Sequence, residues 1–268
     1  YARLAASSGK TGGPLAPKTV RNTHIVLHRA LSDAERLGEV SRNVAHVART
    51  PTARRTTAAT WTEDELSTFL DFVADDRLFG AYVMLATTGM RRGEVFGLRW
   101  EDLDLEASRL SIMQTLISVN GQCLIEPTKT NRSRRAVSLD ESTIAVLRAH
   151  RRRQNEERLA FGEQWDESYG LVFCKPDGTP ENPDTFSRAF KRKAAEAGLP
   201  AMRGVHNLRH TWATLALKAG VHPKVVSDRL GHATIAVTID TYSHVAPSLD
   251  AEAAATVAAG IFKTRLPN

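Results

Sequence analysis

The sequence predicts a mainly α-helical fold with one small antiparallel β-sheet (α+β), arranged as a short helical N-terminal part and a larger second domain. Three observations support this prediction. Apolar residues recur with helical periodicity over most of the chain from residue 141 onward. One β-rich stretch, residues 109–126, surrounds an Asn-Gly turn signal. Residues 51–60 are rich in Thr, Ala and Arg without periodicity, as expected of a linker.

The N-terminal part is predicted to contain one main helix, from about Lys18 to Leu37, with Gly38 as its stop. One face of this helix is apolar and is formed by Val20, Leu27, Leu31 and Ala34. The opposite face is basic and carries Lys18, Arg21, Arg29 and Arg36. These four side chains are candidate contacts to a nucleic-acid backbone, with solvation as the plainer alternative.

The second domain is predicted to open with a capping box, because Thr62 and Glu65 have the required spacing. A helix over about 79–87 follows. Strands are expected at 109–119 and 122–126, joined by the Asn-Gly turn, and at 136–139. The remaining helices are expected at 141–159, 183–197, 207–219, 223–230, 234–242 and 249–262.

Positive charge is concentrated at the start of the chain. Residues 1–60 contain ten Lys and Arg against three acids, whereas the rest of the chain is nearly balanced. Such an asymmetry indicates a polyanion-binding arm or small domain, and nucleic acid is the usual partner of such a surface. A solubilising basic tail is the alternative.

Composition argues against membrane and secreted classes. No run approaches the roughly 18 apolar residues that a membrane span requires, and the first residues lack the apolar core of a secretory signal. Two cysteines, Cys123 and Cys174, form neither a metal quartet nor a disulfide framework, which fits a reducing cytoplasm. The chain begins at Tyr1 rather than Met, and we expect it to be a piece of a longer protein.

Several segments carry side chains that could do chemistry, although each has an ordinary structural explanation. Arg91 and Arg92 could be a solvated pair, and Lys129 could be a polar turn residue. His206 and His210 are four residues apart, a spacing that can hold a metal, but their segment offers no third ligand. We therefore predict no metal site.

Taken together, the same segments contain the groups that phosphoryl transfer to a tyrosine needs. Arginine forks and histidines hold a phosphodiester and stabilise its pentavalent transition state. A histidine can accept the proton of a phenol, and a lysine can protonate the departing alkoxide. Tyr242 is then the candidate nucleophile of a covalent mechanism.

The order and the amino-acid patterns of these segments resemble those of the tyrosine recombinase (phage integrase) family. Its pattern of T-G-x-R-x-x-E, a hairpin lysine, H-x-L-R-H, L-G-H and a tyrosine appears here as TTGMRRGE, PTKTNRSRR, VHNLRHTWAT, RLGHATIAVT and DTYSHV. The resemblance covers about residues 61–250 and is weaker over 18–50. It implies a partial helical core-site DNA-binding domain (1–50), a linker (51–60) and a tyrosine recombinase catalytic domain with a C-terminal helix (61–268).

The resemblance implies a role for each residue. Arg91 and Arg209 would clamp the scissile phosphate, with a further hydrogen bond from His232. Lys129 would be the general acid for the departing 5′-hydroxyl, and His206 the acid/base partner of the phenol. Glu94 would support the residues that contact the phosphate without contacting the phosphate itself. Tyr242 would become linked to the DNA 3′-phosphate, without metal or other cofactor.

The resemblance also implies partners. These are double-stranded DNA attachment sites, a homotetramer that exchanges strands through a Holliday junction, and accessory DNA-bending and excision factors, in the cytoplasm and away from membranes. The expected reaction is integration or excision of a phage or mobile element. Three alternatives stay open: a type IB topoisomerase, a recombinase that resolves chromosome or plasmid dimers, and a DNA-binding module without catalysis.

Overall fold

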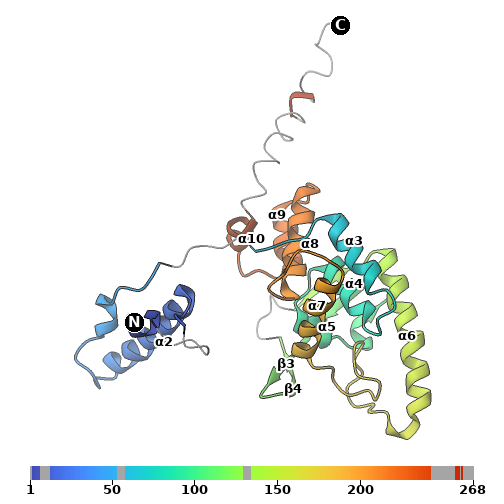
Figure 1. Ribbon diagram of the computed structural model, residues 1–268, viewed down its shortest axis with the longest axis horizontal. Coiled ribbons are helices and arrows are strands. Elements are labelled where there is room, and N and C mark those ends of the chain that lie inside the picture. Colours follow the sequence, from blue (N-terminus) through green and yellow to red (C-terminus); the bar gives the residue numbers. More distant parts are fainter. Residues whose placement is uncertain are drawn as a thin grey trace. The chain divides into compact units, whose positions relative to one another are not determined.

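The computed structural model describes residues 2–6, 13–52, 58–128, 134–242, 257–259 and 261. The chain forms two compact units, Tyr1–Thr57 and Ala58–Asn268, called here the N-terminal unit and the larger unit (Figure 1). Within the described ranges, no helix combines the length and the apolar character needed to cross a membrane. The mainly helical class with small antiparallel sheets is confirmed.

The N-terminal unit consists of α1 (Ala2–Ala6), α2 (Pro17–Arg36) and the short 3-10 helix η1 (Val44–Val47). Helix α2 matches the predicted helix, but its apolar face is only partly covered: Val20 is fully buried, whereas Leu27 is 45% exposed. Asn43 ties η1 to α2, because its side-chain amide donates to His28 O at 2.9 Å and to Ser32 Oγ at 2.8 Å.

The larger unit begins with helical elements and small sheets. These are α3 (Glu63–Phe72), α4 (Phe79–Thr88), α5 (Arg92–Phe96), η2 (Trp100–Asp102), β1 (Leu103–Asp104), β2 (Arg109–Ile112), β3 (Gln114–Val119), β4 (Gln122–Pro127) and β5 (Arg135–Ser138). Helices follow as α6 (Glu141–Phe161), η3 (Gly162–Gln164), α7 (Pro183–Glu196), α8 (His206–Lys218), α9 (Pro223–Leu230) and α10 (Ile235–Tyr242). The bounds predicted for α6 to α10 agree within two residues.

The predicted single sheet is divided into two. Strands β1, β2 and β5 form one antiparallel sheet, and β3 and β4 form a separate hairpin. The run 109–119 changes partner at Met113, whose carbonyl accepts a hydrogen bond from Thr128 N at 3.1 Å. The predicted Asn-Gly turn is confirmed, because Asn120 and Gly121 both have positive φ, 51° and 83°, as a type I′ hairpin requires.

The core of the larger unit surrounds α4, which contacts α3, α5, α6 and α8 (Figure 1). Eight residues of this ten-residue helix are buried. Aromatic rings pack beside it, with Tyr82 stacked on Phe186 at 4.5 Å and edge-on to Phe69 at 5.3 Å. Because α4 is central, Gly89, which directly follows it, leads the next segment into the middle of the unit.

The start of the larger unit is locked to α8. The predicted capping box at α3 is confirmed: Thr62 N donates to Glu65 Oε2 at 2.8 Å, and Glu65 N donates to Thr62 Oγ1 at 3.2 Å. Trp61 N donates to Thr211 Oγ1 of α8 at 3.1 Å. The first residues of this unit therefore hold α8 in place.

Helix α5 packs against β3 through two glycines one turn apart. A Cβ atom added at Gly93 would lie 2.7 Å from Leu116 O, and one at Gly97 would lie 2.9 Å from Leu116 N. Thr115 Oγ1 would also lie 2.5 Å from the atom at Gly93, but the two Leu116 atoms belong to the backbone of β3 and cannot move aside as a flexible side chain could. These glycines set the position of α5, and with it the position of Arg91 and Glu94.

We expect Gly97→Ala to lower the free energy of unfolding by about 1–3 kcal/mol, through overpacking against β3. Urea unfolding followed by circular dichroism would measure the change. Gly204→Ala is the matched control, because its added methyl group would meet only Lys191 Cε at 3.8 Å. The control should be unchanged or more stable by up to about 1 kcal/mol. Equal effects at both positions would contradict close packing of α5 on β3.

Candidate active site

Three arginine side chains converge on the C-terminal end of α9. Arg135 Nε donates to Arg229 O at 2.6 Å, Arg209 Nη2 to Leu230 O at 2.6 Å, and Arg91 Nη2 to Gly231 O at 3.3 Å. The last carbonyls of a helix have no partner within the helix, and they carry the negative end of its dipole. Three successive carbonyls therefore accept hydrogen bonds from arginine side chains that belong to β5, α8 and the start of α5.

Arg209 joins two helix ends. Its Nη1 donates to Gly89 O, just after α4, at 2.8 Å, while its Nη2 binds the end of α9, and the residue is only 3% exposed. Gly89 has φ of 66°, and a Cβ atom there would lie 2.8 Å from both Leu230 Cδ2 and Trp212 Cε3. Only glycine permits this approach, which brings the carbonyl of residue 89 to Arg209.

Glu94 is a buried carboxylate shared by two arginines. Arg135 binds it with two hydrogen bonds, Nη1 to Oε1 at 3.1 Å and Nη2 to Oε2 at 2.9 Å. Arg91 Nη1 donates to Oε1 at 2.8 Å, and Arg91 N donates to Oε2 at 2.8 Å. Burial acts to raise the pKa of Glu94, but these bonds and charges outweigh it, so its pKa lies below the ordinary value. The carboxylate is ionised at neutral pH.

His206 and His232 are uncharged at neutral pH. Burial lowers the pKa of both rings to about 4, and the nearby positive charges of Arg209 and Arg91 act in the same direction. The His206 ring meets His210 edge-on, with centroids 5.2 Å apart. His232 Nδ1 lies 2.7 Å from Oγ1 of Thr238, a fully buried residue of α10. With the hydroxyl as donor, the neutral ring carries its proton on Nε2.

The neighbouring arginines of the TGMRRGE segment have different environments. Arg91 faces Glu94 and the end of α9, with 41% of its side chain exposed. Arg92 instead binds α7: its Nη1 donates to Pro183 O at 2.9 Å and to Ser187 Oγ at 2.6 Å. Arg91 can therefore reach a ligand, whereas Arg92 anchors a helix.

The structure brings together five residues that the sequence singles out: Arg91, Glu94, His206, Arg209 and His232. Tyr242 ends α10, four residues or about one helical turn after Thr238. Lys129 lies outside the described residues, as does most of the helix expected at 249–262. On α2, Arg29 and Arg36 both pair with Asp33, at 3.5 and 3.3 Å.

Three residues of the site were not identified from the sequence. Arg135 lies one residue before the strand predicted at 136–139, and in β5 it shares a face with the buried Val137, so a strand one residue longer would have indicated its burial. Arg229 lies over the Trp212 ring, 5.1 Å from its centroid, and donates to Ser138 O at 3.0 Å. No sequence pattern indicates that contact or the one between Thr238 and His232. Among the described residues, no group of three His, Cys, Asp or Glu could hold a metal ion.

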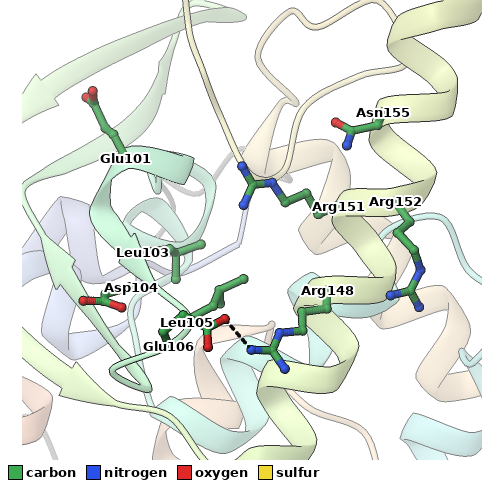
Figure 2. Close-up of a pocket in the computed structure, with 9 residues that line it drawn as sticks. All are labelled: Glu101, Leu103, Asp104, Leu105, Glu106, Arg148, Arg151, Arg152 and Asn155. Atoms are coloured by element: carbon green, nitrogen blue, oxygen red, sulfur yellow. Dashed lines mark hydrogen bonds and ion pairs between the residues drawn. The ribbon is translucent and has the colours of Figure 1, made fainter.

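A separate hollow lies between residues 101–106 and α6 (Figure 2). Basic side chains line one side, Arg148, Arg151 and Arg152, and acidic side chains line the other, Glu101, Asp104 and Glu106. Arg148 Nη2 lies 2.8 Å from Glu106 Oε1. Because the opposite charges balance, the hollow does not favour anions, and it contains none of the converging residues.

Comparisons with known proteins identify a family model and relatives that match much of the chain. The model of the phage integrase family matches residues 59–248. A relative from Caldanaerobacter subterraneus subsp. tengcongensis, named tyrosine recombinase XerC-like, is 32% identical over 209 residues, which cover 74% of this chain and 53% of the relative. The ICEBs1 integrase of Bacillus subtilis is 27% identical, with 90% of this chain and 65% of the relative covered. The chain thus spans about half to two thirds of the length of these relatives.

Solved structures share the fold. The Tn1549 transposon integrase, in complex with transposon right end DNA, has a TM-score of 0.73 at 23% identity, over 85% of this chain and 75% of that one. A lambda integrase dimer bound to a core site has a TM-score of 0.56 at 17% identity, over 85% of this chain and 80% of that one.

We expect the free energy of unfolding to fall as the pH is lowered from about 6.5 to about 4. Histidines in the unfolded chain bind protons with a pKa of about 6.5, whereas folded His206 and His232 bind them only near a pKa of about 4. The unfolded chain therefore takes up more protons across this window, and acid favours it. His150, buried and also with a pKa of about 4, contributes in the same direction.

Urea unfolding at pH 7 and pH 5 measures this effect. His206→Gln removes one of the proton-binding groups, so the difference between the two pH values should shrink in that variant. Imidazole titration by NMR assigns the groups individually. Ordinary titration of His206 and His232 near pH 6.5 would contradict the desolvation and the nearby positive charge that lower their pKa values.

Proposed function

The chain belongs to the phage integrase family, and we propose that it carries the catalytic machinery of a site-specific tyrosine recombinase, the integrase of a phage or mobile element. Such an enzyme cleaves and rejoins double-stranded DNA through a 3′-phosphotyrosine intermediate. The observation that carries the proposal is the convergence of Arg91, Arg209, His206 and His232 from distant segments of the chain.

The arginines suit the charge that develops on a phosphate during transfer. We propose that Arg91 and Arg209 bind the non-bridging oxygens of the scissile phosphate, because guanidinium forks match that geometry. Arg209 is already oriented by two backbone carbonyls, so little reorganisation is needed when the transition state forms. With the Thr238 hydroxyl as donor to its Nδ1, His232 carries its proton on Nε2 and adds a further hydrogen-bond donor.

The covalent step needs a base and an acid. In the proposed reaction, the phenol oxygen of Tyr242 attacks phosphorus while His206, neutral at pH 7, accepts the phenol proton. The bond from phosphorus to the 5′-oxygen breaks, and Lys129 gives that oxygen a proton. The products are a 3′-phosphotyrosine and a free 5′-hydroxyl. A 5′-hydroxyl of a second duplex reverses the step, so the bond energy is conserved and no nucleotide is consumed.

The wider reaction is also a proposal. Two duplexes would exchange strands through a Holliday junction within a homotetramer, with accessory DNA-bending and excision factors choosing the direction. The basic residues of α2, Lys18, Arg21, Arg29 and Arg36, would contact backbone phosphates. Recombination would take place in the cytoplasm, where the bacterial chromosome lies. Relatives named integrase, among them ICEBs1 integrase, support this reading.

We expect the chain to form a covalent adduct with a nicked attachment site, in chelator and without added metal. The site would be designed so that the short 5′-hydroxyl fragment diffuses away and the adduct accumulates. Tyr242→Phe should abolish the adduct, because it removes only the nucleophilic oxygen. Denaturing gel electrophoresis of labelled DNA provides the measurement.

Tyr169→Phe is the matched control. Tyr169 is partly buried, packs against the core and is far in sequence from the converging arginines. The Tyr169→Phe variant should therefore form as much adduct as the wild type. Arg209→Lys tests the clamp and should slow adduct formation by about 10²–10³-fold. An adduct in Tyr242→Phe, or DNA binding without any adduct in the wild type, would count against the proposal. Supercoil relaxation by a monomer without synapsis would instead indicate a topoisomerase.

A further inference from the structure

We propose that Arg135 is a positioning residue for this reaction, which holds Glu94 and the end of α9 in the arrangement that Arg91 and His232 require. The inference rests on the proposed function of the site. Arg135 has no role in the catalytic set that the family motifs indicate. Its contacts nevertheless connect more parts of the site than those of a simple surface arginine.

The geometry of Arg135 is that of a rigid bridge. Its side chain is 8% exposed, it binds both oxygens of Glu94, and its Nε binds Arg229 O. The backbone of Arg135 pairs with Ile112 in the β2–β5 ladder, so the base of the bridge belongs to a sheet. One guanidinium thus fixes α5 and the end of α9 relative to β5.

The charge balance around Glu94 depends on this bridge. Oε1 of Glu94 accepts from both Arg91 Nη1, at 2.8 Å, and Arg135 Nη1, at 3.1 Å. Two guanidiniums sharing one carboxylate keep a net positive charge beside the phosphate site. Without Arg135, Glu94 would have Arg91 as its partner and would neutralise it. We expect the attraction of Arg91 for phosphate to weaken accordingly.

The position of His232 depends on the same bridge. Arg135 holds the carbonyl of residue 229, three residues before His232, while Arg209 and Arg91 hold the next two carbonyls. Burial is the main cause of the lowered pKa of His232, and the charge of Arg135 contributes. The other charged or titratable groups around the ring and its adjoining hollow are Arg91, Arg209, His210, Lys224 and Asp228.

Arg92 offers a matched control. It is also a partly buried arginine that binds a backbone carbonyl, a hydroxyl and a carboxylate, through Pro183, Ser187 and Asp184 of α7. It lies next to Arg91 in sequence, yet it does not contribute to the bonds at Glu94 or at the end of α9. Loss of Arg92 therefore reports the structural cost of losing a partly buried arginine without disturbing the proposed positioning.

The experiment compares Arg135→Gln, Arg135→Lys and Arg92→Gln in single-turnover cleavage of the nicked site, at saturating protein. We expect Arg135→Gln to slow cleavage by about 100-fold, the cost of a small misplacement of catalytic groups, with less change in the protein concentration that half-saturates the DNA. Arg135→Lys, which keeps the charge but not the fork, should recover part of the rate. Arg92→Gln should lose stability in urea yet cleave within about threefold of wild type.

A second readout is the NMR titration of His232 in the free protein. Arg135→Gln should raise its pKa slightly from about 4, because Arg135 is the smallest of the causes that lower it, and Arg92→Gln should leave it unchanged. Equal slowing by Arg135→Gln and Arg92→Gln at equal loss of stability would overturn the inference, as would an unmoved His232 titration. If the wild type formed no adduct, the proposed function would fail, and the His232 titration would still decide the positioning role.

Discussion

The end of helix α9 is the feature on which the site depends. Its three terminal carbonyls accept hydrogen bonds from Arg135, Arg209 and Arg91, which come from three other parts of the larger unit. These acceptors are uncharged, so they orient guanidiniums without cancelling their charge. A carboxylate for each arginine would have neutralised all three, whereas Arg91 and Arg135 share a single one, Glu94. The site thus combines fixed geometry with positive charge, which a phosphate ligand requires.

A second consequence of this arrangement is the state of the histidines. Partial desolvation and the nearby arginines disfavour protonation of the imidazoles, so His206 and His232 stay neutral at physiological pH. A neutral ring can accept a proton, and with the Thr238 hydroxyl as donor to Nδ1 the neutral His232 ring can donate one hydrogen bond from Nε2. Glu94, which is shared by Arg91 and Arg135, offsets part of the positive charge while leaving the cluster net cationic.

The elements that the sequence predicts well are those with local signals. Thr62 and Glu65 mark the start of α3, and Gly231 marks the end of α9. The change of strand partner at Met113 has no local signal, because a run of β-branched and apolar residues looks the same whichever strand it pairs with. Fold class and helix bounds were therefore predictable, whereas the division of the sheet was not.

The candidate site shows the same distinction at the level of side chains. Motif spacing singled out Arg91, His206, Arg209 and His232, but it could not distinguish the environment of Arg91 from that of Arg92, which depends on which helix each side chain meets. Side chains alternate between the two faces of β5, and Arg135 lies on the same face as the buried Val137. The contact between Arg229 and Trp212 is purely tertiary. Side chains that act by holding other side chains leave the weakest sequence signal, because their partners are set by packing rather than by spacing.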